Sequence, residues 1–143
     1  MNLKPIMKIP VTEGLVDLAM LLGIGTDLLC LRRFFDICQR RGADRVARKI
    51  LSEREFAEYL KKGKDGWRYL ASRFSVKEAA YKAMYPDKIL ELKMVSYVIG
   101  SAKPQIFVKG INNIYRFHAS VSHDADMLSS FVVVEKDTTN DVQ

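Results

Sequence analysis

Apolar and polar residues follow two different rhythms along the chain, which divide it into a helical part and a part made of strands. An apolar run at 18–27 predicts a buried strand that runs into a tight Gly-x-Gly turn. Helical periodicity follows and predicts helices over 28–42, from residue 52 onward, and over 67–85. Alternation at period two then predicts strands at 94–100, 104–110, 115–122 and 128–135, with a turn at 123–126. The order β-α-α-α-β-β-β-β indicates an α+β fold with a mainly antiparallel sheet.

Three local signals mark where the predicted helices begin and end. Ser52 and Glu55 have the spacing of a capping box, so the second helix is expected to start at 52–53. Gly42 is a plausible end for the first helix, since glycine tolerates the backbone that follows a helix. Pro86 is expected to end the third helix.

One side of the predicted helix at 67–85 carries apolar residues together with one carboxylate. At 100° per residue, Glu78 lies near the middle of this stripe, and Lys82 lies one turn further along, at its edge. A buried carboxylate is costly unless a positive group or hydrogen bonds accompany it. Either Lys82 neutralises Glu78, or Glu78 faces a site that needs its charge. The apolar members of the stripe are Trp67, Leu70, Ala71, Phe74, Tyr81 and Tyr85.

Length and composition indicate a single globular domain. The 143 residues are 48% apolar, and residues 18–136 are expected to form one core between an irregular arm at 1–17 and a polar tail at 137–143. The longest apolar run, 18–25, is too short to span a bilayer. Residues 1–20 form a poor transit peptide and lack a secretory signal. An intracellular protein is therefore expected, with the cytoplasm and the mitochondrial matrix both open.

The net charge of +6 favours an anionic partner, such as nucleic acid, an acidic protein or a phosphorylated small molecule. Basic residues are concentrated in one segment, where they form either a solvated face or a docking surface for an acidic partner. Cys30 and Cys38 are expected to be small core or helix-face residues in a reducing compartment. The segment's basic residues are Arg32, Arg33, Arg40, Arg41, Arg45, Arg48 and Lys49, against the acids Asp36 and Asp44.

Three short motifs, GIGTD, KEAAYK and SVSHD, carry the candidate chemistry. Each has an ordinary interpretation: Asp27 as a helix cap, Glu78 with Lys82 as a helical ion pair, and His123 as a polar turn residue. Taken together, they place Asp27 at a strand end, Glu78 on an inward helix face and His123 at another strand end. Two carboxylates with phosphate and water oxygens suit Mg²⁺. Nearby cations would neutralise a diphosphate, so a diphosphate ester is the expected substrate type.

These motifs, in this order and spacing, resemble the holo-acyl-carrier-protein synthase type of 4′-phosphopantetheinyl transferase. The matching segments are GIGTDLLCLRRF at 23–34, ASRFSVKEAAYKAM at 71–84 and VSHDADMLSSFVVVE at 121–135. The resemblance extends over about residues 22–136. It implies the fold of that family in its single-half form, in which the chain forms a homotrimer with active sites between subunits.

The resemblance also implies a catalytic set made of Asp27, Glu78, Lys82 and His123. Asp27 and Glu78 match the carboxylates that hold Mg²⁺ against the pyrophosphate of coenzyme A. Lys82 matches a lysine that contacts the phosphates beside the metal. His123 matches a histidine close to the coenzyme, and Asp124 follows it where some members also have aspartate.

Further basic residues match binding positions of the family. Arg73 and Lys64 match residues near the nucleotide phosphates. Arg33 matches the arginine of the first helix that docks the acidic carrier protein, with Arg40 on the same face. Two departures stand out: Cys30 replaces an acid that many members carry, and Tyr85-Pro86-Asp87 replaces their glycine-rich loop.

The implied reaction transfers the phosphopantetheine arm of coenzyme A to a serine of an apo carrier protein and releases adenosine 3′,5′-bisphosphate. The base that takes the serine proton is either a water molecule oriented by Asp27 at the metal or His123 with Asp124. Two other hypotheses remain: a small basic nucleic-acid-binding domain and a catalytically inactive homologue. The first has no RRM, KH or zinc signature to support it.

Overall fold

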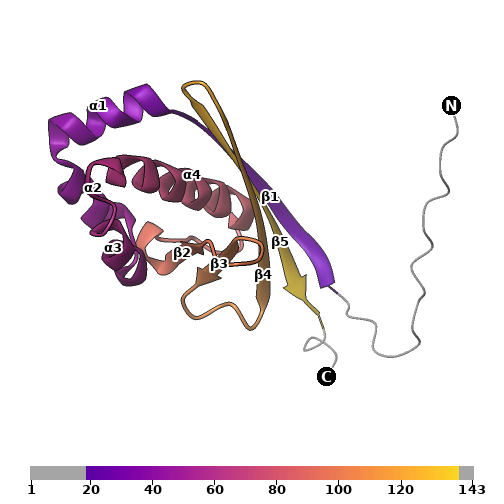
Figure 1. Cartoon of the computed structure of the whole chain (residues 1–143). Coiled ribbons are helices and arrows are strands. Elements are labelled where there is room, and N and C mark those ends of the chain that lie inside the picture. The colour runs from indigo at the N-terminus through magenta and orange to yellow at the C-terminus, as the bar shows by residue number, and fades with distance from the viewer. Residues whose placement is uncertain (1–18, 139–143) are drawn as a thin grey trace, which may run out of the picture.

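The structure, a computed structural model, describes residues 19–138, in which helices cover one side of an antiparallel sheet (Figure 1). The predicted arm at 1–17 and the last residues of the predicted tail lie outside this range. The fold is α+β, as predicted. In chain order the elements are β1 Ala19–Cys30, α1 Leu31–Arg41, α2 Ala43–Ile50, α3 Glu53–Tyr59, the 3₁₀ turn η1 Gly63–Asp65, α4 Gly66–Met84, the 3₁₀ turn η2 Leu92–Met94, β2 Val95–Val98, β3 Gln105–Val108, β4 Tyr115–Asp124 and β5 Met127–Asp137.

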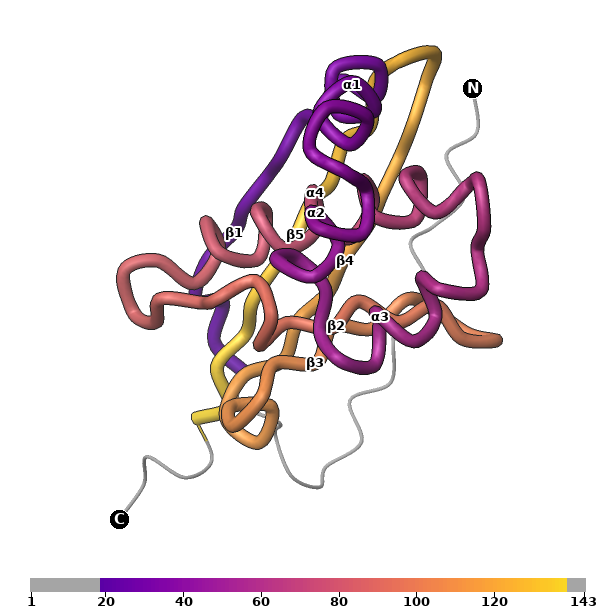
Figure 2. Tube along the Cα trace, turned by 90° about the vertical axis from the view of Figure 1, so that its left-hand side faces the viewer, coloured from indigo at the N-terminus to yellow at the C-terminus, as the bar shows by residue number. Residues whose placement is uncertain are grey.

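The strands form two antiparallel sheets. The larger sheet has the order β1-β5-β4, and the smaller one pairs β2 with β3. Asp27 of β1 lies opposite Ser130 of β5, which in turn lies opposite Val121 of β4. α4 runs across the helix-covered face of the larger sheet, while α1, α2 and α3 lie further out (Figures 1 and 2).

The structure corrects the prediction for the first strand. β1 continues through Cys30, so residues 28–30 are strand and α1 begins at Leu31. Gly23 and Gly25 lie within the strand and make no turn. β1 is also not buried on both faces, because Ile24 and Leu28 on its outer face are 59% and 67% exposed.

The two glycines of β1 allow the strand to lie directly against the backbone of α4. A Cβ atom at Gly25 would overlap the carbonyl oxygen of Ala79, and one at Gly23 would overlap that of Ala83. A side chain at either position would therefore push the helix away from the sheet. The Gly-x-Gly pattern in the sequence therefore reflects the close packing of β1 against α4 rather than a turn.

The basic segment contains a helix that the sequence patterns did not predict. α2 buries Val46, Ala47 and Ile50. Because these three residues cover only two short turns and are separated by charged residues, the segment gave a weak helical signal. It follows α1 after a sharp change of direction at Gly42, whose φ of 82° favours glycine.

Two clusters of buried residues form the core. One lies between α4 and the strands and includes Val76, Ala80 and Val132. The other lies beneath α1, α2 and α3 and includes Phe34, Leu51 and Leu70. α4 belongs to both, and it is therefore buried around most of its circumference.

This double burial explains why the predicted stripe on α4 was only partly correct. Leu70 and Ala71 are fully buried, as expected, but Tyr85 lies beyond the helix end and is 59% exposed. Glu78 lies at the edge of the buried surface rather than at its centre, and its side chain is half-buried. Because apolar residues occur on nearly every side of α4, their periodicity does not define the rotation of the helix about its axis.

The three predicted boundary signals at Gly42, Ser52 and Pro86 are confirmed, although α1 begins later than predicted. Ser52 Oγ accepts a hydrogen bond from the backbone of Glu55, and the carboxylate of Glu55 accepts one from the backbone of Ser52. α1 ends before Gly42, and α4 ends two residues before Pro86. The tail begins later than predicted, since β5 extends to Asp137.

Candidate functional site

The site is a pair of carboxylates brought together by β1 and α4. Asp27 lies two residues after Gly25, and Glu78 lies one residue before Ala79, so the two acids flank the close contact between strand and helix. Asp27 is on the face of the sheet that α4 covers, together with Ser130 and Val121, because residues paired across strands share a face. The fold therefore places both carboxylates at one edge of the helix–sheet packing.

Asp27 has one carboxylate oxygen without a partner. Its side chain is 15% exposed, and Oδ2 is buried with no hydrogen-bond donor. Oδ1 lies 3.4 Å from Lys82 Nζ. A buried carboxylate oxygen left without a donor is costly, so Asp27 is suited to a cation that this oxygen can bind.

The pKa of Glu78 depends on its burial and on its two charged neighbours, Asp27 and Lys82. Burial raises the pKa of its carboxyl group, the negative charge of Asp27 raises it further, and Lys82 opposes both effects. Two carboxylates that repel one another favour a bound cation over separate charges. A cation bound near Glu78 would lower the pKa of its carboxyl group again.

Lys82 is the third member of the group. Its ammonium donates a 2.8 Å hydrogen bond to the carbonyl oxygen of Thr26 and lies beside Asp27. The side chain is half exposed, so the ammonium can also face a bound anion. The sequence predicted all three residues, and the structure brings them together.

The donors present fit Mg²⁺. Mg²⁺ is commonly held by one or two carboxylates, with its remaining positions taken by water and substrate phosphates. Asp27 and Glu78 provide such a pair. Between residues 19 and 138 no group of three or more His, Cys, Asp and Glu side chains forms a complete cage for a metal, so the other ligands would have to come from outside these side chains.

A cavity of about 510 Å³ opens beside Glu78. Tyr81 and Leu92 form apolar parts of its wall, and Lys49 and Lys93 provide positive charge. None of these four residues was predicted to belong to the site. Lys49 was recognised only as part of the basic segment, and no sequence motif pointed to Lys93.

A second cavity, of about 570 Å³, lies between the end of β1, α1, α2 and α4. Its wall is apolar, with Phe34, Ile37 and Phe74 among its members, and Arg33 lines it as well. Lys49 lines both cavities. The remaining lining residues are Leu28, Leu29, Cys30, Arg41, Arg45, Val46, Ile50 and Met127.

The structure does not bring His123 to the carboxylates of its own chain. His123 is an exposed residue near the end of β4, and β5 lies between β4 and β1. Two strand spacings separate β4 from β1 by roughly 10 Å, before the offset along the strands is counted. Asp124 is the next residue of β4 and is also exposed, so neither residue lies in the predicted turn.

The predicted phosphate-binding and docking residues lie elsewhere on the helices. Arg73 is buried, with its guanidinium stacked 3.7 Å from the ring centroid of Tyr69, and its Nε has no partner. Lys64 is exposed in η1. Arg33 and Arg40 are exposed on α1, two turns apart.

A buried ion pair beneath the site was missed by the sequence interpretation. Lys77 and Glu55 are completely or almost completely buried, and Lys77 Nζ donates a 2.6 Å hydrogen bond to Glu55. Lys77 also donates to the carbonyl oxygens of Ile50 at 2.8 Å and Leu92 at 2.9 Å. All three N–H groups of the ammonium are thus used, as the charged form requires. In the sequence, Lys77 is the first residue of the KEAAYK motif and lies next to Val76 on a largely apolar helix, but no pattern pairs it with Glu55.

Comparison with known proteins agrees with this geometry. Residues 23–133 match the model of the 4′-phosphopantetheinyl transferase superfamily. The holo-[acyl-carrier-protein] synthase of Polaromonas sp. is 35% identical over 130 residues, which cover 82% of this chain and 98% of the relative. The crystal structure of the Neisseria meningitidis enzyme of the same name is 30% identical, covers 82% of this chain and 100% of its own, and superposes with a TM-score of 0.71.

A third similar protein has been solved with a bound ligand. The holo-(acyl-carrier-protein) synthase of Bacillus anthracis, 25% identical with a TM-score of 0.67, covers 82% of this chain and 99% of its own and was solved in complex with CoA (3′,5′-ADP). The chain belongs to the 4′-phosphopantetheinyl transferase superfamily. Within it, the chain is an enzyme of the holo-[acyl-carrier-protein] synthase type, as the three motifs indicated.

Proposed function

We propose that this protein transfers the 4′-phosphopantetheine group of coenzyme A to a serine of an apo acyl carrier protein. The observation that carries the proposal is the pair Asp27–Glu78 beside Lys82, in a chain that belongs to this transferase family. The names of the relatives and the coenzyme complex of the Bacillus anthracis protein support the same reaction.

Asp27 and Glu78 are the residues that would hold Mg²⁺. When bound, the metal supplies positive charge to the phosphoryl oxygens of the substrate. Lys82 presents its ammonium to the same diphosphate from beside Asp27. The unpartnered Oδ2 of Asp27 and the raised pKa of Glu78 are the features of this chain that favour a cation there.

In the proposed reaction the serine oxygen forms a bond to the β-phosphorus of coenzyme A. The bond from that phosphorus to the bridging oxygen breaks, and adenosine 3′,5′-bisphosphate leaves with the electron pair. The serine proton passes to a base, for which His123 with Asp124 and a water molecule oriented by Asp27 are the candidates. The chain itself contributes positioning and charge neutralisation, which together can lower the barrier by several kcal/mol.

The cavity beside Glu78 suits the nucleotide part of coenzyme A. Lys49 and Lys93 can face its phosphates, and Tyr81 offers an aromatic wall. Arg73 and Lys64 remain proposed contacts for the nucleotide phosphates. For Arg73 the support is its unpartnered Nε, a buried donor that an anion would satisfy.

The carrier protein is proposed to dock on α1. Arg33 and Arg40 lie on the same exposed face, and Arg33 borders the apolar cavity. An acidic carrier that also presents an apolar side chain would match both features.

We infer that three copies of the chain assemble through the outer face of the larger sheet. Ile24, Leu28 and Phe131 expose 59%, 67% and 43% of their surface there, and Phe131 lies opposite Thr26, between the other two. Exposed apolar patches of this kind mark contact surfaces. In such an assembly His123 of one subunit would complete the site of another. Its distance from Asp27 within one chain supports this arrangement.

Mass spectrometry tests the reaction. An apo acyl carrier protein is incubated with this protein, coenzyme A and Mg²⁺, with an EDTA sample as control. The expected result is a mass increase of one phosphopantetheine group that EDTA abolishes. No increase on several discrete and synthase-derived carriers would contradict the proposal and favour an inactive homologue. A native mass other than three chains would contradict the trimer.

A further inference from the structure

Lys77 holds two walls of the cavity beside Glu78 through hydrogen bonds made from the buried side of those walls. Its ammonium binds the carbonyl oxygens of Ile50 and Leu92. Ile50 directly follows Lys49, and Leu92 directly precedes Lys93; Lys49, Leu92 and Lys93 all line that cavity. One buried cation therefore connects two cavity walls, from the end of α2 and from η2, to the helix that carries Glu78.

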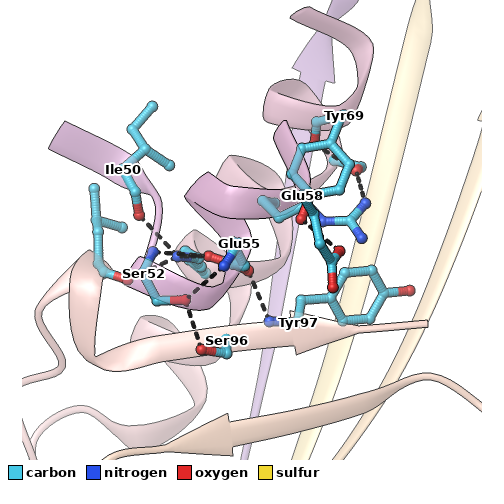
Figure 3. Close-up of polar contacts among 11 residues, drawn as sticks. Ile50, Ser52, Glu55, Glu58, Tyr69, Ser96 and Tyr97 are labelled. Atoms are coloured by element: carbon cyan, nitrogen blue, oxygen red, sulfur yellow. Dashed lines mark hydrogen bonds and ion pairs between the residues drawn. The ribbon is translucent and has the colours of Figure 1, made fainter. Parts of the chain in front are cut away.

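Glu55 extends this connection to two more segments. One carboxylate oxygen accepts from Lys77 and from the backbone N–H of Ser52, and the other accepts from the backbone N–H of Tyr97 in β2, at 2.8 Å. Figure 3 shows Glu55 between Ser52 and Tyr97, with the carbonyl of Ile50 nearby. Apart from the amide of Ser52, which is part of the helix cap, these bonds join elements far apart in the sequence.

The network also restrains the rotation of α4 about its axis. The close contacts of Ala79 with Gly25 and of Ala83 with Gly23 determine which side of α4 faces β1, and the Lys77 network adds a second restraint on the rotation. The ammonium of Lys77 permits only the rotation in which it reaches both carbonyl oxygens and Glu55. Glu78 is the next residue, 100° further round the helix, so the direction of its carboxylate toward Asp27 follows from the position of Lys77.

We infer that Lys77 is a positioning residue for the cation and coenzyme site. It touches neither ligand, and it acts by holding Glu78 and the two cavity walls in place. This inference rests on the proposed function, because it assigns Lys77 a role toward the site formed by Asp27 and Glu78. An ion pair kept only for stability would leave ligand binding unchanged once the protein is folded.

The test compares Mn²⁺ binding, as a spectroscopic probe for Mg²⁺, in full-length proteins saturated with coenzyme A. The main variant is Lys77→Met combined with Glu55→Gln, because removing the lysine alone would leave a buried charge unpaired. Free Mn²⁺ is followed by electron paramagnetic resonance at a temperature where circular dichroism shows the variant folded. The variant is expected to bind Mn²⁺ about tenfold more weakly, the size of effect typical of residues that support metal ligands.

Tyr69→Phe is the matched control. It removes a 2.9 Å hydrogen bond between α4 and Glu58 of α3 without touching the Lys77 network. This control is expected to lower the midpoint of thermal unfolding and to bind Mn²⁺ as the unaltered protein does. A folded double variant with unchanged Mn²⁺ binding would overturn the inference.

Two further results separate the possible failures. If the double variant does not fold, Lys77→Arg retains the charge but cannot reproduce the same three bonds, and Mn²⁺ binding equal to that of the unaltered protein would overturn the inference. If the unaltered protein binds no Mn²⁺ in the presence of coenzyme A, the proposed cation site itself is wrong. Phosphopantetheine transfer by the unaltered protein tests the reaction independently of Lys77.

Discussion

At the scale of single residues, the carboxylate of Glu78 can be tested without altering its shape. Glu78→Gln keeps the side-chain volume and removes the charge. We expect Mg²⁺-dependent transfer to fall by about 100-fold or more, because metal binding supplies several kcal/mol of transition-state stabilisation. Phosphopantetheine transfer measured by mass spectrometry checks this. Glu53→Gln, at an exposed position on α3, serves as the control, and full activity of the Glu78 variant would refute the metal role.

The pH dependence of stability provides a second test of Glu78. Because burial and Asp27 raise its pKa, the folded protein binds this proton more tightly than the unfolded chain does. The contribution of Glu78 to the free energy of unfolding is therefore lost as pH rises from the group's ordinary pKa through the raised one. With EDTA present, Glu78→Gln is expected to unfold at a higher temperature than the unaltered protein at neutral pH. The two should converge below the ordinary pKa, and a constant difference would contradict this assignment.

The residues of the site differ in how far the sequence alone could identify them. Asp27, Glu78 and Lys82 were found because each belongs to a short motif and because the motifs occur together. Lys77 belongs to the same KEAAYK motif, yet its partner Glu55 lies on another helix, so only the fold reveals their contact. Arg73 stacks on Tyr69, four residues earlier in the same helix, and this spacing is visible in the sequence. The burial of Arg73 is not visible there, because it depends on the elements that pack around α4.

At the scale of secondary-structure elements, a change that disturbs the contact between β1 and α4 should lower the free energy of unfolding measurably. Gly25→Ala adds a Cβ atom that would overlap the backbone of Ala79. We expect the free energy of unfolding to fall by about 1–3 kcal/mol, the usual cost of overpacking. Chemical denaturation checks this value. Gly100→Ala is the matched control, because a Cβ atom there meets no neighbour within 4 Å and should leave stability nearly unchanged.

The exposed face of α1 can be tested by reversing one charge. Arg33→Glu is expected to raise the KM for the carrier protein by about tenfold, equivalent to about 1.4 kcal/mol, while the KM for coenzyme A stays the same. Steady-state kinetics with each substrate varied in turn provides the measurement. Lys103→Glu makes the same change of net charge in the loop between β2 and β3 and should alter neither constant. An equal loss for both substrates would place the docking face elsewhere.

The elements themselves were predictable where one pattern dominates. The period-two strands and the capping box of α3 were correct because alternation and capping are local. α2 was missed because its apolar residues span too few turns among many charges. The rotation of α4 could not be derived from the sequence, since a helix buried on most sides has no single apolar face.

At the scale of the whole molecule, the proposed sharing of the site between copies predicts complementation. Asp27→Ala and His123→Ala should each be nearly inactive alone. In mixed trimers a site can take Asp27 from one variant and His123 from the other, so random 1:1 assembly restores roughly a quarter of the sites. Transfer activity after mixing and reassembly provides the measurement. A mixture as inactive as its components would show that each chain must supply both residues itself.

The two cavities have a consequence for the design of inhibitors. They have volumes of about 570 and 510 Å³, within the range of typical small-molecule sites, and Lys49 lines both. One is mainly apolar, and the other contains Tyr81, Glu78 and two lysines. Two fragments of opposite character could therefore be joined by a short linker across Lys49, and the second fragment would then bind at a high effective concentration. Such a bivalent molecule would contact Glu78 and the apolar wall formed by Phe34 and Phe74 at once.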